Sequence, residues 1–271
     1  MNEIELSAGT IEYDDVGSGP TIVLLHGLMM DSSLWAGPVA ELSAGHRCVV
    51  PTLPLGAHRR ATSPAADLSL PGVARLVEEF LERLELTDVT LVGNDTGGAI
   101  VQLMLSCDRI GRIVLVSCEA FDNLPPGLTG KTLALVGKLS PRMLGLFLQQ
   151  LRLRPMRRLP ITFGWLTKRG DAATARWLQP VLGDAAIRRD VVRVLRTAFA
   201  DRELLIKAAE QLPSFDRPAL VVWAADDRVM PPAHGRRLAE LLPQGKLVEV
   251  EDSYTLIPLD QPHRLAELIS G

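Results

Sequence analysis

The stretch from Val89 to Gly98, Val-Thr-Leu-Val-Gly-Asn-Asp-Thr-Gly-Gly, decides how we interpret the rest of the chain. Its apolar, β-branched start is typical of a buried strand. Glycines lie on both sides of Asp95, and an apolar segment of helical type follows over residues 99–106. The pattern predicts a strand, a sharp turn and a helix, with Asp95 raised above the edge of a sheet. Taken alone, these residues would also fit an ordinary turn rich in Gly, Asn and Asp.

The composition is that of a soluble globular protein. The chain has 271 residues, of which 47% are hydrophobic and 23% charged, so one α/β domain with an inserted segment can form a full core. A net charge of -3 gives no electrostatic reason to expect nucleic acid. The first ten residues lack the features of a signal peptide, and no apolar run could span a membrane, so we expect no membrane partner and a cytoplasmic location.

The three cysteines, Cys48, Cys107 and Cys118, lie in or beside apolar segments. Their number is odd and no metal-binding spacing joins them. We therefore interpret them as buried, reduced thiols, and the sequence predicts no cofactor and no metal site.

Strand patterns alternate with helical ones along most of the chain. Strands are expected at residues 3–6, 10–16, 21–25, 47–50, 89–94, 112–117, 218–223 and 246–250. A helix with apolar residues at helical spacing is expected over Leu70–Leu86. Strands that alternate with helices predict a mostly parallel sheet covered on both faces, with ligands beyond the carboxyl ends of the strands.

Strand signals disappear between about Pro125 and Leu212. Helical spacing there predicts helices at residues 131–138, 142–153, 172–182 and 185–209. We interpret residues 125–212 as a helical cap inserted into a core of residues 1–124 and 213–271. This segment carries a set of basic residues that we interpret as a solvated face in preference to an anion-binding surface: Arg152, Arg154, Arg157, Arg158, Lys168 and Arg169.

With these motifs in view, the chain resembles an α/β-hydrolase-fold protein from end to end. The resemblance rests on His26-Gly27 after the third strand, the Asp95 turn, Asp227 with Pro231 after the seventh strand, and Asp260-Gln261-Pro262 near the end. It implies an eight-stranded sheet and an oxyanion hole made by the backbone N–H groups of Leu28 and Thr96. Aspartate at the raised position most resembles the haloalkane dehalogenase and epoxide hydrolase branch, where it acts as the nucleophile.

That branch also implies an acid and a histidine. The acid is expected at Asp227, after the seventh strand, or at Glu119, after the sixth, and Asp227 is preferred. The histidine position, seven residues before Pro262, holds Thr255, whose hydroxyl cannot act as a base near neutral pH. Of the five histidines, His58 is the one whose loop could bring it over the pocket, while the other four are interpreted as structural: His26, His46, His234 and His263.

Other features of the branch are absent. Dehalogenases hold the halide with an Asn and a Trp, but the matching positions here are Leu28 and Thr96. Epoxide hydrolases resemble one another in a pair of cap tyrosines, whereas Tyr13 and Tyr254 both lie outside the cap. The resemblance therefore does not imply dehalogenase or epoxide hydrolase activity for this chain.

Three hypotheses remain. The first is a hydrolase in which Asp95 attacks, or activates water against, an epoxide, halide or ester carbon of a small to medium, fairly apolar organic molecule, with a replacement base. The second is a lyase, isomerase or cyclase in which Asp95 moves a proton within one substrate. The third is a ligand-binding protein without turnover. A small-molecule substrate is expected in the first two, and a homodimer is left open.

Overall fold

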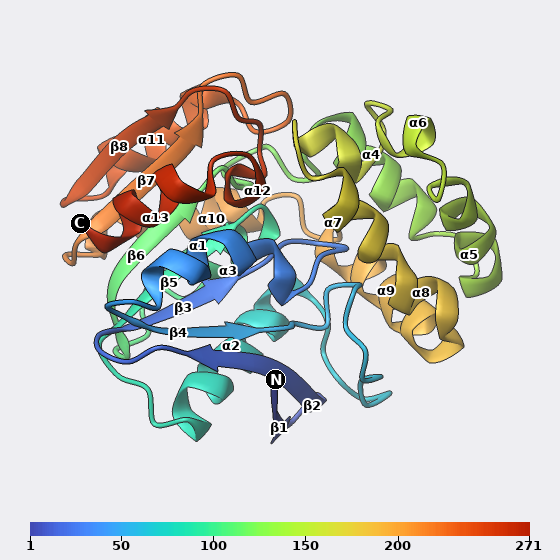
Figure 1. Ribbon diagram of the computed structural model, residues 1–271, viewed down its shortest axis with the longest axis horizontal. Helices are drawn as coiled ribbons and strands as arrows, with labels where there is room; N and C mark the ends of the chain where they lie inside the picture. The colour runs from blue at the N-terminus through green and yellow to red at the C-terminus, as the bar shows by residue number, and fades with distance from the viewer.

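The sheet has eight strands in the order β1-β2-β4-β3-β5-β6-β7-β8 (Figure 1). The computed structural model describes residues 1–271. The strands are β1 (Asn2–Leu6), β2 (Gly9–Val16), β3 (Thr21–Leu25), β4 (Arg47–Pro51), β5 (Val89–Asn94), β6 (Ile110–Val116), β7 (Ala219–Ala224) and β8 (Gly245–Val250). β2 pairs antiparallel with β1 and with β4, and all other pairs are parallel. The predicted mostly parallel, eight-stranded sheet is confirmed.

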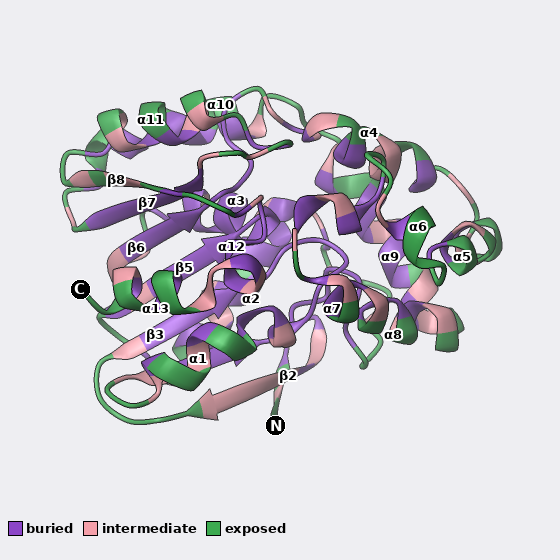
Figure 2. Ribbon diagram, turned by 45° about the horizontal axis from the view of Figure 1, so that its top comes forward, coloured by how far each residue is buried: buried purple, intermediate pink, exposed green.

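The central strands are apolar along their whole length because both faces of the sheet are covered. All six residues of β7, Ala-Leu-Val-Val-Trp-Ala, are buried, and Figure 2 shows β5 and β7 inside the molecule. In Figures 1 and 2, α1 and α13 lie on one side of the sheet and α2, α3, α10 and α11 on the other. The helices of the core are α1 (Ala36–Leu42), α2 (Leu70–Arg83), α3 (Thr96–Gln102), α10 (Leu204–Ala209), α11 (Pro232–Leu241), α12 (Ile257–Asp260) and α13 (Pro262–Ser270), with 3₁₀ turns η1 (Ser32–Trp35) and η3 (Leu212–Ser214).

The chain between β6 and β7 is helical and contains no strand. Its first part forms a group of helices beside the sheet (Figure 1). These are α4 (Gly127–Val136), α5 (Pro141–Gln150), α6 (Arg154–Arg157), η2 (Phe163–Leu166), α7 (Asp171–Arg176), α8 (Leu178–Gly183) and α9 (Ala185–Ala198). The helix α10 lies before residue 212 but packs against α3, a helix of the core. The predicted cap boundary at residue 212 therefore stays a prediction.

The single helix predicted over residues 185–209 is wrong, since the chain forms two helices, α9 and α10. Helical dihedrals end at Phe199, and the carboxylate of Asp201 accepts a hydrogen bond of 2.9 Å from the backbone N–H of Glu203. A short side chain that bonds to nearby backbone competes with helix formation, which periodicity alone does not reveal. The helix predicted over residues 172–182 is likewise divided, at Trp177.

Two of the three cysteines, Cys48 and Cys118, are buried as expected, whereas Cys107 is only partly buried, and all three are free thiols. Arg157 also differs from the expected solvated face. Its side chain is buried and donates hydrogen bonds of 2.8 Å to the carbonyl oxygens of Leu151 and Arg152. None of the helices combines the length and apolar character needed to cross a bilayer.

Candidate active site

Asp95 occupies the turn between β5 and α3, with φ 54° and ψ -132°. A positive φ is strained for a residue other than glycine, and such strain is often found at functional sites. The strand and the helix approach so closely that a Cβ atom on Gly93 would lie 2.3 Å from the carbonyl oxygen of Gly97. The turn predicted from the sequence is thus present, with Asp95 at its tip.

The Asp95 carboxylate is held through Oδ1. This oxygen accepts hydrogen bonds from the backbone N–H of Thr96 at 2.8 Å and from the Thr96 hydroxyl at 3.1 Å. The backbone N–H of Leu28 also faces the carboxylate and lowers its pKa. A Cβ atom on Gly27 would lie 2.1 Å from Oδ1, so only glycine leaves room for it. Burial raises the pKa of Asp95 to about 6, and these donors oppose the shift.

Glu119 lies just after β6 and is joined to Asp95 through Thr96. The Thr96 hydroxyl is 2.8 Å from Glu119 Oε1, while Oε2 is buried without a partner. Burial, and then the nearby charge of Asp95, raise the pKa of Glu119 well above its usual value. The Thr96 hydroxyl has one proton to donate, so it can bond both carboxyl groups when one of them is protonated and donates to it. The arrangement therefore suits a pair of carboxyl groups that shares a proton.

Asp227 lies after β7 and accepts three hydrogen bonds at Oδ1. The donors are the backbone N–H of Val229 at 2.9 Å, the backbone N–H of Met230 at 2.8 Å and the hydroxyl of Thr255 at 2.8 Å. Oδ2 is buried without a partner, and burial raises the pKa of Asp227. Asp227 and Thr255 thus face one another, as the resemblance implies for the acid and the histidine position.

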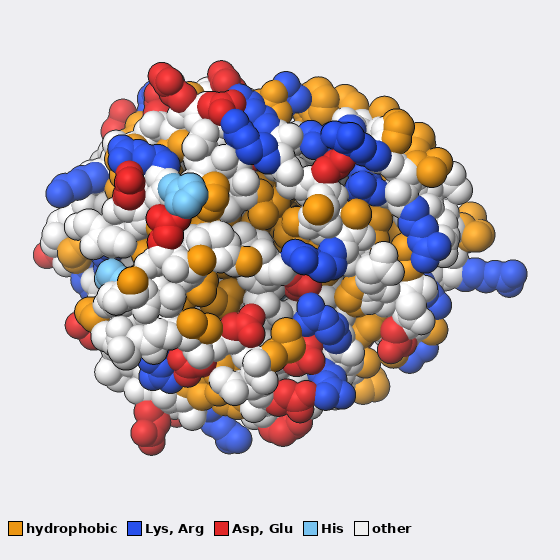
Figure 3. All heavy atoms as spheres, viewed as in Figure 1, with side chains coloured by type: hydrophobic (Ala, Val, Ile, Leu, Met, Phe, Trp, Pro, Cys, Tyr) orange, Lys and Arg blue, Asp and Glu red, His pale blue; other side chains and the backbone are white.

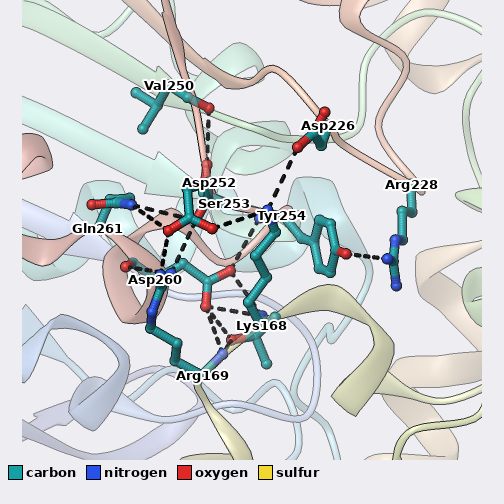
Figure 4. A network of polar contacts seen from close by, with 11 residues as sticks. Lys168, Arg169, Asp226, Arg228, Val250, Asp252, Ser253, Tyr254, Asp260 and Gln261 are labelled. Carbon is teal, nitrogen blue, oxygen red and sulfur yellow. Dashed lines mark hydrogen bonds and ion pairs between the residues drawn. The ribbon is translucent and has the colours of Figure 1, made fainter.

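A polar network holds the loop that carries Thr255 (Figure 4). The carboxylate of Asp260 accepts hydrogen bonds from the backbone N–H groups of Lys168, Arg169 and Tyr254. The side chain of Asn94, which precedes Asp95, donates a hydrogen bond of 2.8 Å to the carbonyl oxygen of Thr255. The Thr255 loop is therefore tied both to the inserted segment and to the end of β5.

A small cavity lies above Asp95, lined also by Glu119 and Leu28. The remaining lining residues are mostly apolar and come largely from the inserted helices: Pro126, Thr129, Gly130, Leu133, Phe163, Leu166, Phe199 and Val229. The free space is about 20 Å³, which is close to the room needed for one water molecule. Asp227, Thr255 and His58 do not line this cavity.

The histidines have partners other than Asp95. His58 is buried, with Nδ1 accepting from the backbone N–H of Gly56 at 3.3 Å and Nε2 lying 3.5 Å from Asp190 Oδ2 of α9. The structure therefore does not bring the candidate His58 to the cavity. His26 Nε2 accepts a hydrogen bond of 2.9 Å from the backbone N–H of Leu53, and burial lowers the pKa of His26 to about 4.

Sequence reasoning missed two features of this site. It assigned Thr96 only a backbone role, although its hydroxyl joins the two carboxyl groups. It also named none of the cavity residues from the inserted helices, such as Thr129 and Phe163. These positions belong to no motif, and helical periodicity does not distinguish a core-facing residue from a pocket-facing one.

Comparisons with known proteins agree with this architecture. The sequence profile of the alpha/beta hydrolase family matches residues 22–268. Haloalkane dehalogenase 2 from Mycobacterium tuberculosis (strain ATCC 25618 / H37Rv) is 28% identical over 268 residues, covering 97% of this chain and 91% of the dehalogenase.

Solved structures resemble the chain over its whole length. A thermophilic esterase from Thermogutta terrifontis has a TM-score of 0.74 at 20% identity, covering 100% of this chain and 97% of the esterase. The enol-lactonase from Burkholderia xenovorans LB400 has a TM-score of 0.73 at 19% identity, covering 99% of this chain and 98% of the lactonase. At these identities the likeness shows a shared fold.

Proposed function

Because the chain belongs to the alpha/beta hydrolase family, we propose that it is a hydrolase in which Asp95 attacks an electrophilic carbon of a small to medium, fairly apolar organic molecule. The carbon belongs to an epoxide, a halide or an ester. The observation that carries this proposal is the position of Asp95 at a strained turn, with Oδ1 held by the backbone N–H of Thr96 and the side chain at an apolar cavity. The similarity to a haloalkane dehalogenase supports an aspartate nucleophile.

Oδ1 of Asp95, which the Thr96 N–H holds, is the oxygen that becomes negative later in the reaction. When water attacks the ester formed on Asp95, the carbonyl oxygen carries the charge of a tetrahedral intermediate. The backbone N–H of Thr96 already points at this oxygen and the N–H of Leu28 faces the same carboxylate, so they are placed to stabilise the intermediate without rearrangement. Oδ2 is then the oxygen that attacks the substrate.

The ester must be hydrolysed by water, and water needs a base. Thr255, which occupies the position where the resemblance places a histidine, donates its hydroxyl proton to Asp227 and cannot take one from water near neutral pH. Neither Thr255 nor Asp227 lines the cavity, whereas Glu119 does. Glu119 is therefore the base in this proposal, in place of histidine.

With an epoxide, the reaction consists of ester formation on Asp95 followed by hydrolysis of that ester. Asp95 Oδ2 forms a bond to an epoxide carbon, the carbon–oxygen bond breaks, and the released oxygen takes the proton of Glu119. The negative charge of Asp95 is now lost to the ester, which removes one cause of the raised pKa of Glu119. The ionised Glu119 then accepts a proton from water as the water oxygen bonds to Cγ of Asp95. The intermediate expels the alcohol oxygen, which takes the remaining hydroxyl proton, and the Asp95 carboxylate is restored.

Labelled water tests this proposal with styrene oxide and 1-bromohexane as probes. In a single turnover in H₂¹⁸O, the heavy oxygen should enter the Asp95 carboxylate and be absent from the product, because water attacks Cγ. Peptide mass spectrometry locates the label. Label in the product and none on Asp95 after one turnover would exclude the covalent route.

One observation favours the second hypothesis, a lyase, isomerase or cyclase. The pKa of about 6 for Asp95 suits a group that both donates and accepts protons near neutral pH. In that case the true product contains no oxygen from water. Ligand binding without turnover of any probe, and without an effect of Asp95→Ala on affinity, would instead favour the binding protein.

A further inference from the structure

The segment from Pro125 to Gly170 has a charge composition unlike the rest of the chain. It contains no Asp or Glu, although the whole protein has a net charge of -3. It contains nine basic residues: Lys131, Lys138, Arg142, Arg152, Arg154, Arg157, Arg158, Lys168 and Arg169. A strongly positive surface on an otherwise slightly acidic protein attracts anionic partners.

Five of these nine are engaged within the protein. Arg157 is buried, Arg154 and Arg158 pair with Asp171, and the last two pair with Asp252. The other four are exposed and form no salt bridge: Lys131, Lys138, Arg142 and Arg152. These four cations are available to a partner.

Exposed apolar side chains gather in the same segment. Of the eleven large hydrophobic residues that are exposed, eight lie within residues 128–161: Leu128, Leu135, Met143, Leu146, Leu153, Met156, Leu159 and Ile161. Single exposed apolar residues are ordinary, but a concentration of them marks an interaction surface.

The helices α4 and α5 each present both kinds of side chain outward. On α4, Leu128, Lys131 and Leu135 are exposed at helical spacing. On α5, the exposed face includes Met143 and Leu146, next to Arg142. Figure 3 shows orange and blue atoms over α4, α5 and α6, with few red ones. We call this surface of exposed cations and apolar side chains on residues 128–161 the cationic apolar face.

We propose that the cationic apolar face docks on a bilayer that contains anionic phospholipid. Leu and Met side chains insert among the lipid chains while Lys and Arg contact the headgroups, the pattern of proteins that lie at membrane interfaces. A second copy of this chain fits less well, because a two-fold dimer through this face would bring like charges together. Nucleic acid offers phosphate but no apolar layer for the leucines.

Docking would place the site next to the membrane. The inward side of α4 lines the cavity above Asp95 through Thr129, Gly130 and Leu133, while its outward side carries the face. The sequence predicts no membrane partner because its first ten residues lack the features of a signal peptide and no apolar run could span a membrane. Docking on the surface of a bilayer requires neither a signal peptide nor a membrane-spanning segment. The docking proposal does not depend on the reaction proposed for Asp95.

Vesicle flotation tests the proposal with the intact chain. Vesicles of phosphatidylcholine and phosphatidylserine, in roughly a 2:1 ratio, should bind the protein at low salt, and phosphatidylcholine alone should not. Raising the salt should release it, because exposed charges are screened. The triple variant Lys131→Gln, Lys138→Gln, Arg142→Gln should bind at least about tenfold more weakly. The double variant Leu135→Ser, Leu146→Ser should also bind more weakly.

A matched control is the double variant Lys246→Gln, Ile206→Ser, which changes an exposed cation and an exposed leucine-sized residue outside the face. It should bind vesicles like the unmodified protein. No binding to the mixed vesicles at low salt would overturn the proposal. Equal losses in the face variants and the control would also overturn it. Sedimentation that shows a dimer lost in Leu135→Ser, Leu146→Ser, without vesicle binding, would assign the face to a second copy.

Discussion

The hydroxyl of Thr255 lies 2.8 Å from Oδ1 of Asp227, and neither side chain lines the cavity above Asp95. This hydrogen bond joins the two positions where a hydrolase triad would hold an acid and its histidine. A threonine there can fix the loop but cannot move a proton from water. The proton transfer that hydrolysis needs is therefore assigned to Glu119, which reaches Asp95 through the Thr96 hydroxyl.

Asp95→Asn should reduce turnover of an epoxide probe by at least about a hundredfold, because an amide is a poor nucleophile and a poor acid–base group. Asp95→Ala should do the same. Circular dichroism should show both variants folded. A folded Asp95→Ala protein with full activity would remove Asp95 from the mechanism.

Stability should depend on pH through the same residue. The pKa of Asp95 is raised by burial to about 6, so its contribution to stability is present below about pH 4 and is lost as the pH rises through about 6. Asp95→Asn should therefore be more stable than the unmodified protein at about pH 8, by on the order of 1–3 kcal/mol, with a smaller difference below about pH 4. Urea unfolding at the two pH values measures this, and an equal difference at both would contradict it.

Activity should rise with pH around the pKa of Asp95. A nucleophilic carboxylate must be ionised, so kcat/KM should increase through about pH 6. It should fall again at higher pH, where Glu119 loses the proton that the epoxide oxygen takes. A pH–rate profile with styrene oxide provides the measurement. A fall in kcat/KM over the same range would favour Asp95 as a general acid and thus the second hypothesis.

Glu119→Gln should cost more activity than Asp227→Asn. The sequence alone favours the opposite order, because Asp227 has the usual position of the acid, but Glu119 lines the cavity and Asp227 does not. The isosteric amides keep the shape of both sites, so differences report on charge and proton transfer. Steady-state kinetics of the two variants measure which substitution costs more activity. A larger loss in Asp227→Asn would indicate that Asp227 is the working acid.

The Asp95 ester should accumulate when its base is removed. In Glu119→Gln, 1-bromohexane should leave a stable adduct on Asp95, visible by intact-protein mass spectrometry, whereas the unmodified protein should clear it. Adding Thr255→His to Glu119→Gln places an imidazole beside Asp227 and should restore part of the turnover. Thr255→Val is the control, since it removes the hydroxyl without supplying a base. Rapid clearance of the adduct in Glu119→Gln would identify another base.

His58→Gln should keep turnover within a few-fold of the unmodified protein, because the imidazole contacts Gly56 and Asp190 and does not line the cavity. It should lower the melting temperature, since Asp190 in α9 loses a buried neighbour. If His58→Gln abolished turnover and left a lasting adduct on Asp95, His58 would be the base in place of Glu119.

The sequence by itself determined the order of strands and helices, the turn at Asp95 and the helical character of the chain between β6 and β7. These features depend on local periodicity, glycine placement and strand composition, which act over short distances along the chain. The resemblance to α/β-hydrolase-fold proteins further implied that Asp227 and Thr255 face one another, and the 2.8 Å hydrogen bond agrees with that pairing.

Only the tertiary structure decided which candidates share a cavity. Glu119 and Asp95 lie 24 residues apart in the chain and meet because β5 and β6 are adjacent parallel strands whose carboxyl ends lie at one edge of the sheet. Nothing local to Thr96 predicts that its hydroxyl reaches both carboxyl groups. His58 was a candidate by its loop, but its imidazole turns to Asp190 on α9, a contact across 132 residues. Such contacts depend on how the inserted helices pack over the sheet, and periodicity along the chain carries no information about that packing.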